Sequence, residues 1–204
     1  MGEILADNKC RCGWCLAFEE YVRYHDEEWG FPVWEERKQF EFLVLESAQA
    51  GLSWATILKK RGGYKKAFAD FDYNLVAEFS ELHIQELIKD QNIVRNELKI
   101  RSAVNNARRF IEVQQEFGSF CTYIWGFVDG VPIQNQWKSL SEVPARTPVS
   151  DKLAKDMKQR GFKFLGSTIL YAHMQATGIV NDHLISCWRY EEVKNWSKEK
   201  AGQI

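Results

Sequence analysis

The sequence has no long hydrophobic run, and none of its segments resembles a membrane span. No stretch approaches the roughly 18 consecutive apolar residues that a spanning helix needs. Segment 1–9 has neither a basic start nor an apolar run, so it does not look like a secretion signal. We therefore predict a cytoplasmic protein that is not associated with a membrane.

Cysteine is also scarce, with 5 residues among 204, and an odd number cannot all be paired. In a chain without a secretion signal, reduced thiols or metal ligands are expected instead of a disulfide framework. The chain is long enough to enclose a hydrophobic core as one domain without disulfides.

Net charge is close to zero, with 27 basic and 28 acidic residues. The whole molecule is not a polycation, so any affinity for nucleic acid must come from a local basic face. Acidic residues predominate over segment 19–46, and a group without acids follows it. This group contains Lys59, Lys60, Arg61, Lys65 and Lys66.

Strand alternation of useful length is absent as well, and helical spacing of apolar residues predicts an all-α fold. Segment 36–50 is expected to form a helix that ends at Gly51, and 96–117 a longer one that ends at Gly118. Segment 127–149 holds three of the four prolines and predicts an irregular connection. Further expected features are a short helix after Ser53 broken by Gly62 and Gly63, and N-caps at Asp72 and Ser80.

Residues 150–177 predict a helix, hairpin, helix unit. Ser150 is expected to cap a helix that ends at Gly161, and a glycine-bounded connection leads to a second helix from Ser167 to Ala176. Free N–H groups at the start of the second helix can bind a DNA phosphate without reading base sequence. An ordinary helical hairpin with a solvated lysine face explains the segment alone equally well.

His183 and Cys187 are four residues apart, which places a nitrogen and a sulfur on one helical face. By spacing alone, a core histidine beside a small buried cysteine is the better interpretation. The N-terminal residues that could complete a tetrahedral zinc site are Cys10, Cys12, Cys15 and His25.

Aromatic residues are abundant, at 14% with 8 Trp. Several lie near Glu46 in sequence, and one carboxylate among rings suits a flat, electron-poor ligand. Each ring taken singly is more often a core residue than a pocket wall. The aromatic residues concerned are Trp14, Tyr21, Tyr24, Trp29 and Trp54.

Several strings, in this order, together resemble the 3-methyladenine DNA glycosylase I family. The resemblance covers about residues 10–188 as a single domain and leaves 1–9 and 191–204 as expected flexible tails. The strings are Arg-Cys-Gly-Trp at 11–14, Tyr-His-Asp-Glu-Glu-Trp-Gly at 24–30, Leu-Glu-Ser-Ala-Gln-Ala-Gly-Leu-Ser-Trp at 45–54, Asn-Ile-Val-Arg at 92–95, Gly-Phe-Lys-Phe-Leu-Gly at 161–166 and Asn-Asp-His at 181–183.

The resemblance implies a helix-hairpin-helix glycosylase fold with one structural Zn²⁺, which clips the two ends of the chain together. The implied ligands are Cys12, His25, His183 and Cys187. Cys10 and Cys15 flank the first of these, so another choice of sulfur stays open.

The resemblance also implies a base pocket and a DNA-binding face. Glu46 is the implied catalytic residue that hydrogen-bonds a flipped base, Trp54 its stacking platform and Tyr24 a further contact. Trp14, Tyr21 and Trp29 are expected pocket walls. The expected DNA contacts are the wedge Leu52 beside Gly51, with Lys163 and Gly166 in the hairpin.

The implied reaction is hydrolysis of the N-glycosidic bond of 3-methyladenine in double-stranded DNA. We expect a monomer, because DNA must reach an open face of the protein. Asn181 stands where many members of the superfamily carry a catalytic Asp, so the substrate must be an easy leaving group, as a cationic base is. No lysine matches an amine nucleophile, and strand cleavage is not expected. Whether Asn181 or Asp182 positions water, and whether 3-methylguanine is also a substrate, stay open.

Two other functions are compatible with the residues alone. One is a non-catalytic, zinc-stabilised helix-hairpin-helix DNA-binding module, and the other is a protein interaction domain with surface Trp. In a binding module, Glu46→Ala should leave or strengthen DNA affinity, whereas in a glycosylase it should remove base release. An interaction domain should have no salt-dependent affinity for duplex DNA.

Overall fold

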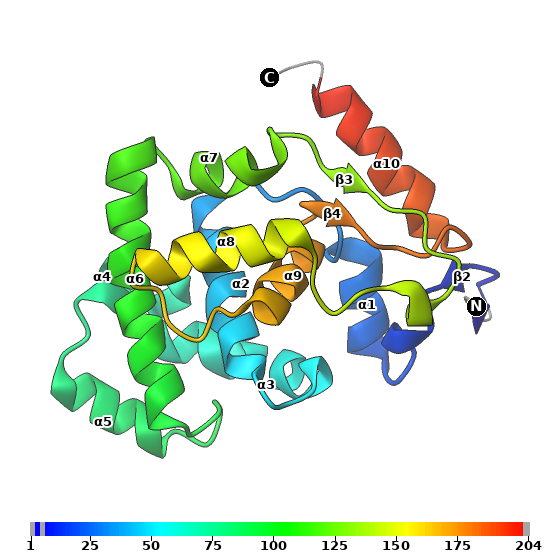
Figure 1. Ribbon diagram of the computed structural model, residues 1–204. Coiled ribbons are helices and arrows are strands. Elements are labelled where there is room, and N and C mark those ends of the chain that lie inside the picture. The colour runs from blue at the N-terminus through cyan, green and yellow to red at the C-terminus, as the bar shows by residue number, and fades with distance from the viewer. Residues whose placement is uncertain (1–2, 5–6, 202–204) are drawn as a thin grey trace.

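The computed structural model describes residues 3–4 and 7–201, and helices predominate in it (Figure 1). None of the helices in this part of the chain is both long and apolar enough to cross a membrane. In chain order the elements are β1 (Glu3–Ile4), β2 (Cys10–Arg11), η1 (Gly13–Cys15), α1 (Glu19–Glu27), α2 (Glu36–Gln49), α3 (Trp54–Ala67), η2 (Ala69–Phe71), α4 (Tyr73–Ala77), α5 (Glu81–Lys89), α6 (Glu97–Phe117), α7 (Phe120–Trp125), η3 (Gly126–Val128), β3 (Ile133–Gln134), η4 (Leu140–Glu142), α8 (Pro148–Gln159), α9 (Ser167–Ala176), β4 (Val180–Asn181) and α10 (Trp188–Ala201).

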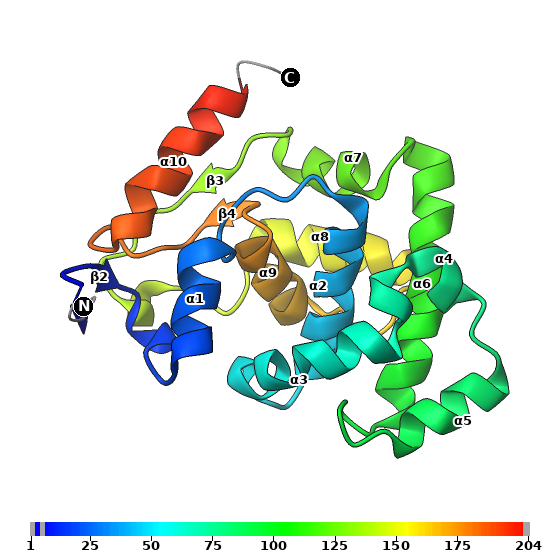
Figure 2. The same ribbon diagram turned by 180° about the vertical axis from the view of Figure 1, so that it is seen from behind.

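Helix α2 lies at the centre of the molecule, with α3, α6, α7 and α9 packed around it (Figures 1 and 2). All residues from Gln39 to Ala48 except Glu41 are buried, so the helix is covered on nearly every side. A helix of this kind is a core element and not a surface one. The predicted helix over 36–50 is confirmed, and its burial places Glu46 inside the protein.

The N-caps expected at Asp72 and Ser80 are confirmed, because each side chain accepts a hydrogen bond from the first turn of its helix. Gly118 follows α6 with a φ of +84°, as the predicted helix end requires. The segment 127–149 is irregular apart from short elements, one of which, β3, pairs in parallel with β4.

The expected break at Gly62 and Gly63 is wrong, since α3 continues through both residues to Ala67. The two glycines differ in their surroundings. A Cβ at Gly63 would lie 2.3 Å from the backbone oxygen of Asn92, whereas a Cβ at Gly62 would have nothing within 4 Å. Gly63 is therefore needed because the segment before α6 packs against the helix.

We expect opposite effects from alanine at these neighbouring positions. Gly62→Ala should raise the free energy of unfolding by about 0.5–1 kcal/mol, because alanine is the better helix former. Gly63→Ala should lower it by about 1–3 kcal/mol, because the backbone of Asn92 must move. Urea denaturation of the two variants measures both. Equal effects of the same sign would contradict this explanation.

The expected cap at Ser150 is also wrong. Helix α8 begins three residues earlier, after Thr147, with Pro148 at its first position. Ser150 is the third helical residue and exchanges hydrogen bonds with Thr147 in a capping box. The turn after α8 and the start of α9 agree with the expected hairpin.

Regular elements occur within both segments that were expected to be flexible tails. Most of segment 191–204 belongs to α10, which is held by buried Tyr190 and Val193 and by the ring of Trp196 against Phe31. Near the other end, β1 pairs with β2 in antiparallel fashion. Residues 1–2, 5–6 and 202–204 of the expected tails lie outside the described residues.

Candidate active site and metal centre

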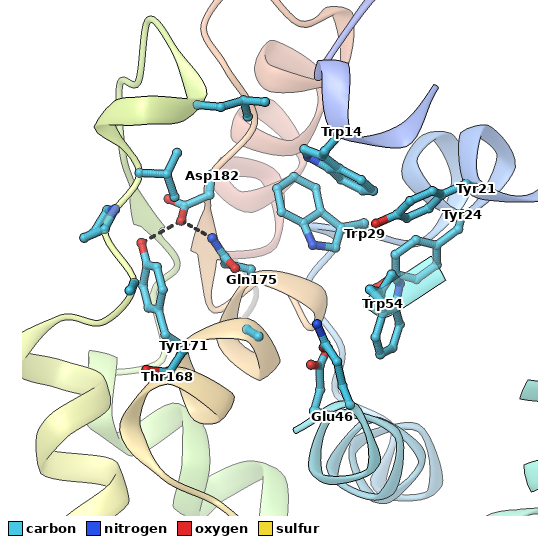
Figure 3. A pocket seen from close by; sticks show the side chains of 16 residues that line it. Trp14, Tyr21, Tyr24, Trp29, Glu46, Trp54, Thr168, Tyr171, Gln175 and Asp182 are labelled. Atoms are coloured by element: carbon cyan, nitrogen blue, oxygen red, sulfur yellow. Dashed lines mark hydrogen bonds between the residues drawn. The ribbon is translucent and has the colours of Figure 1, made fainter. Parts of the chain in front are cut away.

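A cavity of about 440 Å³ opens between α1, the C-terminal half of α2 and α9 (Figure 3). The structure brings together all six residues expected at the base pocket. They line the cavity as Trp14, Tyr21, Tyr24, Trp29, Glu46 and Trp54. These residues come from four separate segments. Helix α3 packs on α2, and Tyr24 of α1 contacts the rings of Phe42 and Trp54, which brings the segments side by side.

The aromatic residues form one continuous wall. Trp14 packs edge-on against Trp29 with ring centroids 4.9 Å apart, and Tyr21 lies 5.0 Å from Trp14. Tyr24 links this group to Trp54 at 5.4 Å. Electron-rich ring faces attract a flat cation, so the wall suits a positively charged planar ligand.

Glu46 lies at the foot of the cavity and is 3% exposed (Figure 3). Among the described residues, its Oε2 atom has no hydrogen-bond partner. Burial raises the pKa of its carboxyl group to about 8. A buried, unpaired carboxyl group is costly to fold, so its presence indicates a ligand that pairs with it.

The raised pKa of Glu46 predicts a pH-dependent cost in stability. The folded protein holds the proton up to about pH 8, whereas the unfolded chain releases it near the ordinary value of 4.5. Between these values the unfolded state is favoured progressively, and the full cost, up to about 5 kcal/mol, is reached above pH 8. Glu46→Gln removes the cost.

We therefore expect Glu46→Gln to match the wild-type protein in free energy of unfolding at pH 4 and to exceed it increasingly from pH 5 to pH 9. Urea denaturation across this range measures the gap, with the Glu116→Gln variant as an exposed control. A constant gap would show that the carboxyl group of Glu46 ionises normally in the fold.

The part of the opposite wall that α9 provides was not expected from the sequence. Thr168, Tyr171 and Gln175 project from one face of α9, and Asp182 follows β4. Their spacing of three and four residues on a largely apolar helix was the available signal.

Asp182 is 2% exposed and accepts four hydrogen bonds. Tyr171 and Gln175 donate to its Oδ2, and Asn135 and Trp137 donate to its Oδ1. The carboxylate thereby fixes the two α9 side chains against the cavity (Figure 3).

Asn181 does not line this cavity. Its amide bonds Gln134 and the Tyr190 carbonyl, and its Oδ1 accepts from the His183 N–H. Of the two residues considered for positioning water, only Asp182 faces the site.

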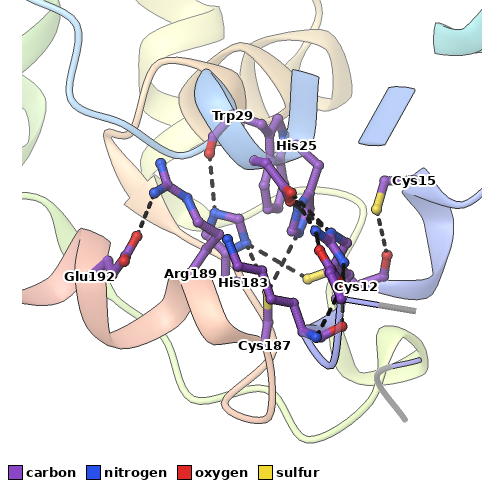
Figure 4. A network of polar contacts seen from close by, with 12 residues as sticks. Cys12, Cys15, His25, Trp29, His183, Cys187, Arg189 and Glu192 are labelled. Carbon is purple, nitrogen blue, oxygen red and sulfur yellow. Dashed lines mark hydrogen bonds and ion pairs between the residues drawn. The ribbon is translucent and has the colours of Figure 1, made fainter. Parts of the chain in front are cut away.

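The four residues implied as metal ligands also come together (Figure 4). They are all buried, and their ligand atoms lie within 4.8 Å of one another. The Cys187 Sγ atom is 3.5 Å from His25 Nε2 and 3.6 Å from His183 Nδ1, and Cys12 Sγ is 3.8 Å from His183 Nδ1. A tetrahedral zinc ion would separate such sulfur and nitrogen ligands by about 3.6 Å.

Both histidines are oriented by their second ring nitrogen. His183 Nε2 lies 3.1 Å from the carbonyl oxygen of Trp29, and His25 Nδ1 lies 2.8 Å from Asp26, which Arg11 holds in turn. Such outer partners are typical of metal-binding histidines. Cys15 instead donates its thiol to the Cys12 carbonyl, so Cys12 is the sulfur of the cluster.

The facing Cys12 thiol and the two imidazoles hold the pKa of Cys187 well below its usual range. A thiolate is the form that binds zinc. The donor set, its burial and its distances therefore fit a structural zinc ion.

The expected DNA contacts lie on exposed loops. Gly51 has a φ of +78° with open space around it, and Leu52 beside it is 42% exposed. The hairpin between α8 and α9 exposes Lys163 and Gly166. Phe164 in this hairpin is 41% exposed and has a positive φ of +57°.

Comparisons with known proteins agree with this geometry. A family model described as methyladenine glycosylase matches residues 14–190. DNA-3-methyladenine glycosylase 1 of Escherichia coli (strain K12) is 44% identical over 180 residues, covering 88% of this chain and 96% of that protein.

Solved structures are similar too. A crystal structure of 3-methyladenine DNA glycosylase I gives a TM-score of 0.85 at 46% identity and covers 87% of this chain and 98% of that one. Another, in complex with 3-methyladenine, gives 0.85 at 36% identity, with 87% and 96% covered. By its sequence and its fold, this chain belongs to the methyladenine glycosylase family.

Proposed function

We propose that the protein removes 3-methyladenine from double-stranded DNA by hydrolysing the N-glycosidic bond, without cutting the strand. The observation that carries this proposal is the buried, unpaired Glu46 carboxyl group at the foot of an aromatic cavity. Family membership favours this activity over a non-catalytic DNA-binding module. The relative solved with 3-methyladenine supports the choice of base.

The cavity is suited to bind a flipped, positively charged base. The aromatic wall attracts the cation through its ring faces, and Glu46 accepts hydrogen bonds from the adenine edge. Both interactions are stronger with a charged base. The ring faces attract the cation directly, and the cation favours the ionised carboxylate of Glu46, which then pairs with it. A neutral adenine gains neither effect, so the pocket distinguishes methylated from normal base by charge.

Cleavage needs little from the protein beyond this pocket, because a cationic 3-methyladenine is already a good leaving group. As the bond to the sugar breaks, the base becomes neutral and is held between Trp54 and its neighbours. Asp182 is the carboxylate on the opposite wall and positions Tyr171 and Gln175 there. We assign the attacking water to this side of the cavity.

We propose that Cys12, His25, His183 and Cys187 hold one zinc ion. The ion would supply structural cross-linking, because four protein ligands leave no open position for substrate. Its ligands come from the segment before α1, from α1 itself, and from the segment between β4 and α10. The clip therefore fixes the two aromatic turns around Trp14 and Trp29 against the segment between β4 and α10.

For the DNA, we propose that Leu52 fills the gap left by the flipped base and that the hairpin binds backbone phosphate. Gly51 permits the turn that exposes Leu52, and Lys163 adds positive charge. Gly166 is the N-cap of α9, and the free N–H groups of this helix start are suited to bind a phosphate.

Release of free bases from methylated duplex DNA, resolved by chromatography, tests the proposed function. We expect selective release of 3-methyladenine and an abasic strand that stays intact until alkali is added. A folded protein that binds duplex DNA but releases no methylated base would leave the DNA-binding module as the better function. Release of 3-methylguanine at a comparable rate would widen the substrate class.

A further inference from the structure

Helix α6 contacts both loops that carry the expected DNA contacts. We call residues 50–53 the wedge loop and residues 161–166 the hairpin. Lys99, in the first turn of α6, reaches the wedge loop, and Asn105 and Asn106 reach the hairpin. None of the three residues lines the base cavity.

Lys99 holds the end of α2. Its Nζ donates to the carbonyl oxygen of Ala48 at 2.8 Å and to that of Ala50 at 2.6 Å. These carbonyls at the C-terminus of the helix lack partners within it, and a cation there is favourable. The loop turns at once through Gly51 to the exposed Leu52, so Lys99 fixes the base of the wedge.

Asn106 holds the hairpin by a matched pair of hydrogen bonds. Its amide nitrogen donates to the Lys163 carbonyl, and its amide oxygen accepts from the Lys163 N–H, both at 2.9 Å. Asn105 donates to the Gly161 carbonyl, also at 2.9 Å. Phe164, the residue after Lys163, has a φ of +57°, which is a strained value for a residue other than glycine.

Lys99 and Asn106 are seven residues apart, so they lie on one face of the helix about 10 Å apart along its axis. Helix α6 itself is anchored, because Ile100, Ala103 and Ala107 are buried in the core. The distance between wedge loop and hairpin is thus set by one rigid element.

We propose that Lys99 and Asn106 are positioning residues that keep the wedge and the phosphate-binding hairpin in register on the duplex. The proposal rests on the proposed function of the two loops. Insertion of Leu52 at a lesion requires the backbone to be held at a fixed distance from it. Loss of either contact lets one loop move relative to the other, so that insertion of Leu52 is no longer coupled to phosphate binding by the hairpin.

The test is a double-mutant cycle with Lys99→Met, Asn106→Leu and the combined variant. The first readout is the dissociation constant for a duplex with a tetrahydrofuran abasic analogue, and the second is release of 3-methyladenine from methylated duplex. Each single variant should weaken duplex binding about 10- to 100-fold. Loss of either contact already breaks the register. The dissociation constant of the double variant should therefore be within about threefold of that of the single variant that binds the duplex less tightly.

Three controls separate positioning from general damage. Binding of free 3-methyladenine, followed by tryptophan fluorescence, should stay within about twofold in all variants, because the pocket is intact. Ser102→Ala, a buried change on α6 that touches neither loop, should leave duplex affinity unchanged. Lys99→Arg keeps donors for both carbonyls and should restore duplex binding.

Should Asn106→Leu fail to fold, Asn106→Asp replaces it, since aspartate still accepts from the Lys163 N–H but cannot donate to its carbonyl. A double variant whose duplex affinity falls by the product of the two single effects would overturn the proposal. Single variants whose duplex affinity does not fall would overturn it as well. If the wild-type protein binds the duplex in register and releases no base, the proposed reaction fails while the positioning role stands.

Discussion

Replacing Glu46 by glutamine should reduce the release of 3-methyladenine from methylated duplex DNA by about 100-fold or more. The side chain keeps its size in the cavity but loses the charge that pairs with a cationic base. Since burial raises the pKa of Glu46 to about 8, the carboxyl group of the empty enzyme is largely protonated at neutral pH. A cationic base must therefore ionise it on binding, and glutamine cannot respond in this way.

Chromatography of released bases under single-turnover conditions measures the effect. Glu41→Gln, one turn away on α2, is the matched control, because its carboxylate pairs with Arg61 and Lys38 outside the cavity. The wild-type kcat/KM should also rise with pH as the free enzyme loses the Glu46 proton, and the glutamine variant should lack this rise. Full activity of Glu46→Gln would exclude the carboxyl group from the reaction.

Removal of the proposed zinc ion should destabilise the protein more than any single change considered above. Structural zinc sites contribute about 10 kcal/mol or more of apparent binding free energy, and much of this stabilises the fold. Without the ion, two buried cysteines and two buried histidines face one another across the junction of the chain ends. We expect a chelator to lower the midpoint of thermal unfolding by tens of degrees, which calorimetry measures.

Elemental analysis should give one zinc per chain, and Cys187→Ser should reduce it to a trace. Cys121→Ser, a buried thiol remote from the cluster, should keep the metal. Base release per folded molecule should change less than stability does. A chelated protein that keeps its fold but loses turnover would point to a catalytic ion instead.

Local rules of sequence explain much of the fold. Apolar spacing was sufficient to find α2 and α6, and glycines such as Gly118 mark helix ends because few other residues adopt a positive φ. The predicted helix break at Gly63 is wrong, because this glycine instead leaves space for the backbone of Asn92, which belongs to a distant segment. Only tertiary packing distinguishes such a glycine from a helix breaker.

One part of the candidate site was predictable from the sequence and another part was not. Glu46, Trp14, Tyr24, Trp29 and Trp54 lie in short strings that resemble a known family, and so do Cys12, His25 and His183. Tyr171 and Gln175 were missed, because their relevance depends on Asp182, which reaches them only after β4 pairs with β3. Nothing in the local sequence of α9 shows that contact.

The Cys and His cluster has a consequence for the order in which the protein forms during synthesis. Cys187 is added to the growing chain 175 residues after its partner Cys12. The proposed metal site cannot close before that point, so the turns around Trp14 and Trp29 lack this support until then. The base pocket therefore cannot be complete before Cys187 has been added to the chain.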